Sequence, residues 1–319
     1  MAGHETSDDD PRGARATSME SGPTGQEPSG AKGRREGESR RLPAGLHVVA
    51  TPIGNLGDIT LRALDTLRDA AVIACEDTRV TGGLCRRLGI DTPLLPYHEH
   101  NAESMRPKLI SRMKNGEAVA LVSDAGTPLV SDPGYKLVRA VVAEGLTVVP
   151  LPGASAALAA LVVAGLPSDR FLFCGFPPQK TKARRDWLAD VAAVPATLVI
   201  YEGPSRLADS LADMAAVLGA GREAAVCREL TKMYEETRRA TLADLATHYA
   251  AAGAPKGEVV VVVGPPLAAA AATEEDLDTL LRAALDRGDS VRDAAAAAAA
   301  ATGRKKREVY ARALEIAGQ

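Results

Sequence analysis

Residues 118–134 read Ala-Val-Ala-Leu-Val-Ser-Asp-Ala-Gly-Thr-Pro-Leu-Val-Ser-Asp-Pro-Gly, and this stretch decides the fold that we expect. Its first five residues are apolar and partly β-branched, which is typical of a strand buried on both faces. Small and turn-forming residues follow, among them Gly126, which permits backbone angles that a Cβ would forbid. Ser131-Asp132-Pro133 then predicts a helix start with a side-chain cap. A strand, a tight polar turn and a helix form the plan of a small-molecule crevice in an α/β sheet.

The residues on either side of this stretch repeat the same plan. Residues 46–50 predict a first strand, a Gly-rich turn follows at 51–58, and a helix begins at Thr60. A second strand is expected at 71–74 and another at 147–149, before the turn Pro-Leu-Pro-Gly-Ala-Ser-Ala. None of these turns is a GxGxxG or Walker loop, so the sequence does not support a phosphate cradle.

The second half of the chain alternates strands and helices again after a hinge-like segment at 164–170. Three polar turns in this half place Lys or Arg beside predicted strand ends, which suits a polyanionic substrate. Surface salt bridges are the alternative explanation of the same cations. The predicted strands are 171–175, 197–201, 224–227 and 258–263.

Composition limits the class of protein. The 319 residues are 46% hydrophobic and only 3% aromatic, with a net charge of −3, which argues against a protein that coats nucleic acid without specificity. The four cysteines form no CxxC pair, so neither a zinc site nor a disulfide framework is expected. No apolar run reaches membrane-spanning length and no signal-peptide core is present, so we expect a soluble cytoplasmic protein.

The polar segment Glu76-Asp77-Thr78-Arg79 has two interpretations. Its carboxylates and cation either bind polar groups of a substrate or cap the following helix. A later loop holds His98 and His100, which would share one side of an extended chain, but no third ligand stands at a useful spacing. We therefore expect no metal and a polar loop, either exposed or facing a substrate.

The polar turns contain eight motifs in this order: Thr-Pro-Ile-Gly-Asn, Glu-Asp-Thr-Arg, Tyr-His-Glu-His-Asn, Ser-Asp-Ala-Gly-Thr-Pro, Ser-Asp-Pro-Gly, Pro-Gly-Ala-Ser-Ala, Tyr-Glu-Gly-Pro-Ser-Arg and Arg-Glu-Leu-Thr-Lys. The chain resembles the ribosomal RNA small subunit methyltransferase I family, of the tetrapyrrole methylase superfamily, over roughly residues 45–266. Ser205 departs from the His expected after Pro in the Tyr-Glu motif, which leaves the role of this one position open.

The resemblance implies two α/β domains with S-adenosylmethionine in the cleft between them, usually in a homodimer. It also implies methylation of the 2′-oxygen of a decoding-centre cytidine in small-subunit ribosomal RNA, with the assembled small subunit as the expected partner. Carried over by position, the cofactor residues are Pro52, Ile53, Gly54, Asn55, Ser123, Asp124, Ala125, Gly126, Thr127, Gly153, Ser155 and Ala156.

Other roles remain as alternatives or sets of candidates. A positioned base would help a weakly acidic 2′-hydroxyl, and Glu76, Asp77, His98 and Glu99 are the candidates. A precorrin-type tetrapyrrole methylase would share fold and donor, and a non-catalytic ribosome-binding module is the alternative from another class. The expected substrate-binding residues, most of them cations for RNA phosphates, are Arg79, Lys180, Arg184, Arg206, Glu229 and Lys232.

The ends of the chain differ from its centre. Residues 1–43 hold almost no large apolar side chain beyond Met1, Met19 and Leu42, so we expect a disordered tail. An N-terminal α/β domain at 44–167, a C-terminal α/β domain at 168–268 and a helical extension at 269–319 should follow. In the extension, helices are expected from Thr273, from Ser290 to Gly303, and from the cations 304–307, which oppose a helix dipole and suggest an RNA contact.

Overall fold

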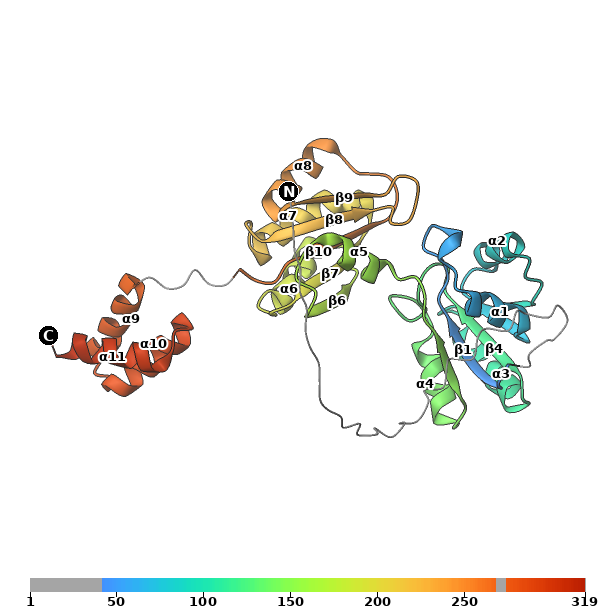
Figure 1. Cartoon of the computed structure of the whole chain (residues 1–319), viewed down its shortest axis with the longest axis horizontal. Helices are drawn as coiled ribbons and strands as arrows, with labels where there is room; N and C mark the ends of the chain where they lie inside the picture. Colours follow the sequence, from blue (N-terminus) through green and yellow to red (C-terminus); the bar gives the residue numbers. More distant parts are fainter. Residues whose placement is uncertain (1–41, 268–273, 319) are drawn as a thin grey trace, which may run out of the picture. The chain divides into compact units, whose positions relative to one another are not determined.

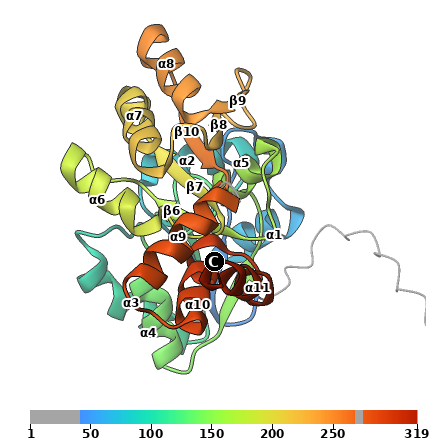
Figure 2. The same cartoon turned by 90° about the vertical axis from the view of Figure 1, so that its left-hand side faces the viewer.

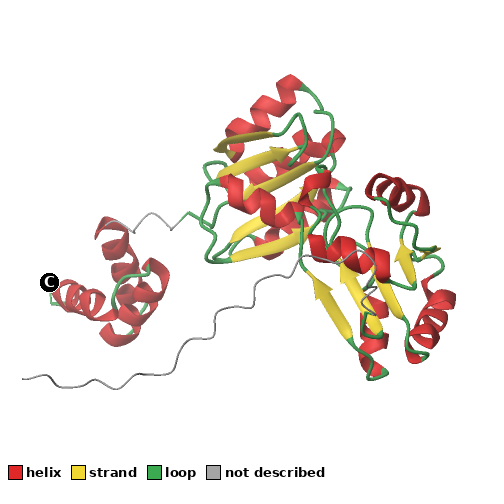
Figure 3. Ribbon diagram, turned by 45° about the vertical axis from the view of Figure 1, so that its right-hand side comes forward, coloured by secondary structure: helices red, strands yellow, loops and turns green. Residues whose placement is uncertain are grey.

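The computed structural model describes residues 42–267 and 274–318 of the chain. The predicted tail at 1–43 lies almost entirely outside these residues, and so does Thr273, the expected cap of the first C-terminal helix. Figure 1 labels most of the elements, and Figure 3 shows strands with helices on both sides of them. The expected α/β class is confirmed.

The first sheet is parallel throughout and has the strand order β3-β2-β4-β1-β5. Its helices α1 and α2 bury apolar residues on one face, and α3 and α4 bury them on the other. Since the strands are covered on both faces, they are almost wholly apolar. The strands are β1 (Gly45–Val49), β2 (Val72–Cys75), β3 (Leu94–Pro96), β4 (Ala118–Val122) and β5 (Val148–Leu151), and the helices are α1 (Leu61–Asp69), α2 (Thr78–Leu88), α3 (Ala102–Lys114) and α4 (Tyr135–Ala143).

The second sheet is mixed, with the order β6-β7-β10-β8-β9. Only β6 and β7 are parallel neighbours, and the other pairs are antiparallel. Helices α6, α7 and α8 cover one face. The strands are β6 (Phe171–Gly175), β7 (Thr197–Glu202), β8 (Glu223–Arg228), β9 (Glu236–Thr241) and β10 (Val259–Val263), and the helices are α6 (Thr181–Val191), α7 (Leu207–Leu218) and α8 (Leu242–Ala252).

Helix α5 (Ala156–Ala164) covers the other face of the second sheet, although it follows directly on the first. Its buried residues Ala157, Ala160, Leu161 and Ala164 pack in one cluster with strands β7, β8 and β10. Ile53, from the turn after β1, belongs to the same cluster. Side chains from the first half of the chain therefore pack in the core on this face of the second sheet. The domain boundary at 167–168 remains a prediction.

The predicted strands are confirmed, whereas one predicted helix start is wrong. Helix α4 begins at Tyr135, after Gly134, and not at Ser131-Asp132-Pro133. Ser131 has a φ of 64°, a left-handed conformation that a helix cannot accommodate. Strands β3 and β9 escaped prediction because one is a short edge strand ending in Pro96 and the other is the polar edge strand Glu-Thr-Arg-Arg-Ala-Thr.

Three further helices end the chain: α9 (Glu274–Asp286), α10 (Val291–Thr302) and α11 (Lys306–Ala317). They bury an apolar core of their own, and Figure 2 shows them packed together. Ser290 caps α10 by accepting a hydrogen bond from the Asp293 backbone, and Gly303 ends that helix in the left-handed conformation, both as predicted. The third helix begins at Lys306 and therefore later than predicted, and Arg304 and Lys305 precede its first turn.

Candidate functional site

The turn after β4 is held by its own side chains. Ser123 is buried, and its Oγ donates to the backbone oxygens of Ala125, at 3.2 Å, and Gly126, at 3.4 Å. Gly126 adopts a φ of +81°, which is the conformational freedom expected of a glycine there. The turn is therefore a rigid polar edge at the carboxyl end of the sheet's central strand.

The turn after β1 is joined to it by an isolated antiparallel bridge. The Thr51 N–H donates to the Gly126 oxygen at 2.9 Å, and the Gly126 N–H returns a bond of 3.0 Å to the Thr51 oxygen. Thr51 Oγ1 also donates to the Ser123 oxygen at 3.3 Å. Because β1 and β4 are parallel neighbours, both turns leave the same edge of the sheet.

A cavity of about 390 Å³ opens beside these two turns, within the size range of small-molecule sites. It brings together seven of the twelve predicted cofactor residues, most of them small. These are Ile53, Asp124, Ala125, Gly126, Thr127, Ser155 and Ala156.

The other five predicted cofactor residues are not among the residues that line the cavity. Ser123 holds the β4 turn, and the Asn55 side chain accepts from the Gly57 backbone N–H. A Cβ on Gly153 would come within 2.9 Å of the Ala50 Cβ, and one on Gly54 within 2.4 Å of Lys232 Cγ. These glycines permit close packing of protein against protein. Pro52 is likewise not among the cavity's lining residues.

The second sheet supplies an aromatic wall that the sequence interpretation missed. Tyr201, near the end of β7, meets the rings of Phe173 and Phe176 edge to face at 4.9 and 5.4 Å. Phe176 and Tyr201 both line the cavity. The sequence did contain a signal for these two aromatic residues, because both adjoin polar turns at predicted strand ends.

Carboxylates gather where β2 and β4 end. The Asp77 backbone N–H donates to Asp124 Oδ1 at 3.1 Å, while the Asp77 carboxylate caps α2 and pairs with Arg79 at 2.6 Å. The hydrogen bonds from Arg79 lower the Asp77 pKa to about 2. Asp77 therefore has the capping role that was one of its two interpretations. Burial, followed by the charge of Asp124, raises the pKa of Glu76.

Asp132 is the site residue whose importance the sequence did not reveal. Burial raises its pKa to about 6, the hydrogen bond from Ser123 opposes the rise, and the charges of Glu76 and Asp124 add to it. Asp132 lines the cavity just described and also a second cavity of about 650 Å³.

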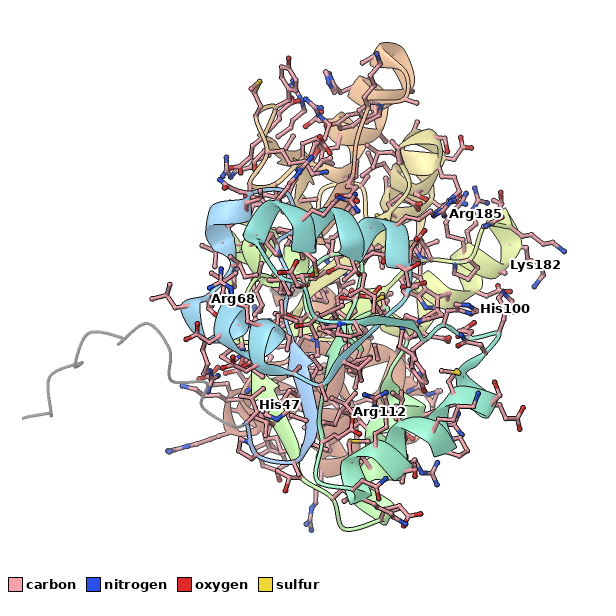
Figure 4. The ribbon with its side chains drawn as sticks, turned by 90° about the vertical axis from the view of Figure 1, so that its right-hand side faces the viewer. His47, Arg68, His100, Arg112, Lys182 and Arg185 are labelled. Carbon is pink, nitrogen blue, oxygen red and sulfur yellow. The ribbon has the colours of Figure 1, made fainter. Side chains whose placement is uncertain are left out.

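The second cavity contains residues from the loop before α3 and from the start of α4. Glu99 and His100 line it, and Figure 4 labels His100. His98 is not among the lining residues, although its ring lies 5.9 Å from that of His100. Among residues 42–267 and 274–318, no group of three or more His, Cys, Asp or Glu side chains could hold a metal ion.

Most predicted substrate cations are paired with carboxylates. Arg206 bonds to Glu202, whose other oxygen accepts from Ser210. Lys232 Nζ bonds to Glu229 at 2.7 Å and to Glu258 at 2.8 Å. Lys180 is exposed at the start of α6, and Figure 4 shows Lys182 on the same helix extending away from it.

Arg184 is a correction to the predicted substrate set. Its side chain is only 4% exposed and bonds to Asp213, which is equally buried, with 2.7 Å between Arg184 Nε and the carboxylate. It also donates to the Gln179 oxygen. This guanidinium is part of the protein interior and does not face an RNA backbone.

Comparison with known proteins identifies the family. Residues 45–246 match the family model of Tetrapyrrole (Corrin/Porphyrin) Methylases, and residues 271–317 match the RsmI C-terminal HTH domain. The ribosomal RNA small subunit methyltransferase I of Mesorhizobium japonicum is 54% identical over 89% of this chain and 96% of its own length. The same enzyme of Pseudomonas aeruginosa is 48% identical over 86% and 98%. The chain belongs to the ribosomal RNA small subunit methyltransferase I family.

Solved structures agree on the fold of this methyltransferase family member. A cobalt precorrin-4 methyltransferase has a TM-score of 0.52 at 19% identity, over 69% of this chain and 94% of that one. A diphthine synthase has a TM-score of 0.54 at 17% identity, over 69% and 89%. The resemblance stated from the motifs is confirmed. No helix among the described residues is both long and apolar enough to span a membrane.

Proposed function

We propose that the chain transfers a methyl group from S-adenosylmethionine to the 2′-oxygen of a cytidine ribose in small-subunit ribosomal RNA. The observation that carries this proposal is the 54% identity to a curated ribosomal RNA small subunit methyltransferase I over 89% of the chain. The cytidine and the 2′-oxygen follow from the family resemblance. The proposed location is the cytoplasm, where small subunits are assembled.

The 390 Å³ cavity fits the methyl donor chemically. Small residues such as Ala125, Gly126 and Ala156 allow close backbone approach, and Phe176 and Tyr201 offer flat apolar surface for a nucleoside. Asp124 places a carboxylate in the same cavity, which suits a ligand with a positive sulfonium. These residues would hold the donor, whose activated methyl group supplies the chemistry. The protein chiefly has to align the acceptor oxygen with that methyl group.

RNA binding is proposed for exposed cations rather than for buried ones. Lys180 stands at the start of α6, and Lys305 to Arg307 stand at the start of α11. Arg79, Arg206 and Lys232 lie near the cavity but share their charge with carboxylates. The assembled small subunit is the proposed substrate, since the family resemblance implies it.

A homodimer is proposed from the exposed face of α5. The helix is apolar throughout, yet Leu158 and Val162 are 50% and 81% exposed. An all-apolar helix is normally covered on every side, and a second copy of the chain would cover this face. Sedimentation of Val162→Glu against Val142→Glu, on the exposed face of α4, tests it. Dissociation of the first variant alone is expected, and loss of the dimer only with the second would contradict α5 as the interface.

Labelled methyl transfer to small subunits that lack the mark tests the function. The product should be resistant to alkaline cleavage at one cytidine, because strand cleavage needs a free 2′-hydroxyl. Isolated ribosomal RNA and a precorrin-type tetrapyrrole serve as parallel substrates. Transfer to the tetrapyrrole alone would support the precorrin alternative, and subunit binding without any transfer would support a non-catalytic binding module.

A further inference from the structure

The loop 129–134 holds Asp132 in an unusual backbone conformation. Leu129 and Ser131 have φ values of 75° and 64°, which non-glycine residues seldom adopt. Such conformations persist only where the surroundings impose them, and they are concentrated at functional sites. Here the conformation replaces the predicted helix start and keeps the Asp132 side chain at the boundary of two cavities.

The second cavity has the side chains that bind a nucleotide. Tyr135, 64% exposed, offers ring surface on which a base can stack. Arg106 and Lys136 bring positive charge for phosphates. The Arg106 Nε is buried and has no hydrogen-bond partner within the described part of the chain. A buried donor without a partner is costly, so a ligand acceptor there would be favourable.

We propose that the second cavity binds the acceptor nucleotide and that Asp132 is the general base for its 2′-hydroxyl. This inference rests on the proposed function. The hydroxyl proton passes to the Asp132 carboxylate while the 2′-oxygen forms a bond to the methyl carbon. The methyl–sulfur bond breaks, its electron pair stays on sulfur, and the positive sulfonium becomes a neutral thioether. Asp132 then releases the proton to water.

The position of Asp132 distinguishes it from the other acids of the site. Asp124 lines only the first cavity, whereas Glu99 lines only the second. Glu76, Asp77 and His98 line neither. Among the described residues, Asp132 is the one titratable group shared by both cavities. A base must touch the acceptor oxygen beside the donor, so the shared residue is favoured over the four candidates from the sequence.

The surroundings of Asp132 suit a base that works near neutral pH. Burial and the nearby Glu76 and Asp124 raise its pKa to about 6, while Ser123 donates a hydrogen bond that lowers it. It is therefore ionised at pH 7 and more basic than an ordinary carboxylate. The other charged or titratable groups that line the two cavities are Tyr201, Glu202 and Glu258 in the first and Tyr97, Glu99, His100, Glu103, Arg106, Tyr135 and Lys136 in the second.

Asp132→Asn is the decisive variant, because it keeps the side-chain shape and removes the base. Calorimetry with S-adenosylhomocysteine should show cofactor affinity close to that of the unchanged protein. Single-turnover transfer to unmethylated small subunits should fall about 10²- to 10⁴-fold. The unchanged protein should lose activity as the pH falls through about 6. The variant's residual rate should lack that step, and Asp132→Glu should restore part of the rate.

Glu144→Gln is the matched control, since it removes a carboxylate at the far end of α4, outside both cavities. It should transfer at the unchanged rate. A rate for Asp132→Asn near that of Glu144→Gln, or an unaltered acid limb, overturns the assignment and leaves the proposed function intact. If the unchanged protein transfers no methyl group to subunits, the function and the base assignment both fail.

Arg106→Ala tests the acceptor cavity separately from the base. It should raise the KM for small subunits and leave S-adenosylhomocysteine affinity unchanged. Lys114→Ala, a cation of the same helix outside both cavities, should leave KM unchanged. Equal KM values for the two variants would remove the acceptor nucleotide from this cavity.

Discussion

Thr51 and Gly126, 75 residues apart, exchange two backbone hydrogen bonds of 2.9 and 3.0 Å across the edge of the first sheet. The bridge joins the turns after β1 and β4 into one wall of the 390 Å³ cavity. The geometry of that wall therefore depends on the left-handed conformation of Gly126.

Gly126→Ala should weaken S-adenosylhomocysteine binding several-fold. An L-residue at a φ of +81° is strained by about 1 to 2 kcal/mol, and the new Cβ would lie 3.3 Å from Ile53 Cγ2. Gly145→Ala is the matched control, because Gly145 has a φ of +68° and nothing within 4 Å. Urea unfolding should show a loss of stability in both variants, and calorimetry a loss of affinity only in the first. Equal affinities would contradict a role of this wall in binding the donor.

Gly54 and Lys232 should show strong energetic coupling. A Cβ on Gly54 would lie 2.4 Å from Lys232 Cγ, so Gly54→Ala displaces the lysine from Glu229 and Glu258. In a Lys232→Ala background the same substitution should cost much less. A double-mutant cycle measured by urea unfolding should give a coupling of about 0.5 to 3 kcal/mol. Additive costs would show that the lysine side chain moves aside freely.

Arg184→Ala should destabilise the protein by up to about 3 to 5 kcal/mol, because it leaves the buried Asp213 carboxylate with only the half-exposed Arg185 as an ionic partner. Arg185, which bonds to the same carboxylate but is 55% exposed, should cost less than about 1 kcal/mol when changed to Ala.

The salt dependence of subunit binding should not change with Arg184→Ala. Lys180→Ala should reduce the log–log salt slope by about 0.7 to 0.9 if it contacts a phosphate. A reduced slope for Arg184→Ala would return that residue to the substrate set.

Asp132→Asn should stabilise the fold at pH 7.5 by on the order of 1 kcal/mol. The folded protein raises the Asp132 pKa to about 6, so its charged form is disfavoured relative to the unfolded chain. This penalty is complete above pH 6 and fades as the pH falls towards the unfolded pKa of about 4. Urea unfolding at pH 7.5 and pH 4.5 should show the advantage of Asn shrinking at the lower pH. An advantage independent of pH would mean that the charge is not its cause.

Changing Arg304, Lys305, Lys306 and Arg307 to Gln should raise the KM for small subunits several-fold and leave S-adenosylhomocysteine affinity intact. The first two residues precede α11, and Lys306 and Arg307 open it, where positive charge opposes the helix dipole. Steady-state methyl transfer and thermal unfolding, measured together, check the prediction. An unchanged KM with a raised Tm would show that the cations only make a poor helix start.

The local pattern was sufficient for most of the fold. The apolar run 118–122 became β4 with the predicted bounds, and Ser290 and Gly303 bound α10 as predicted. Strands buried on both faces, helix caps and left-handed glycines depend on neighbouring residues in the chain, so the sequence reveals them directly. The turns at 51–55 and 123–127 were recognisable for the same reason.

The tertiary structure alone determined which polar side chains are buried, which are exposed and which line a cavity. Arg184 and Lys180 look alike in the sequence, yet one is buried against Asp213 and the other is exposed. The sequence pattern predicted that Asp132 belongs to a helix start. In the structure Ser131 is left-handed, and Asp132 lines two cavities. Burial and charge pairing depend on residues far apart in the chain. Asp213 lies 29 residues from Arg184 in the chain. Glu76, whose charge raises the pKa of Asp132, comes from a different strand end.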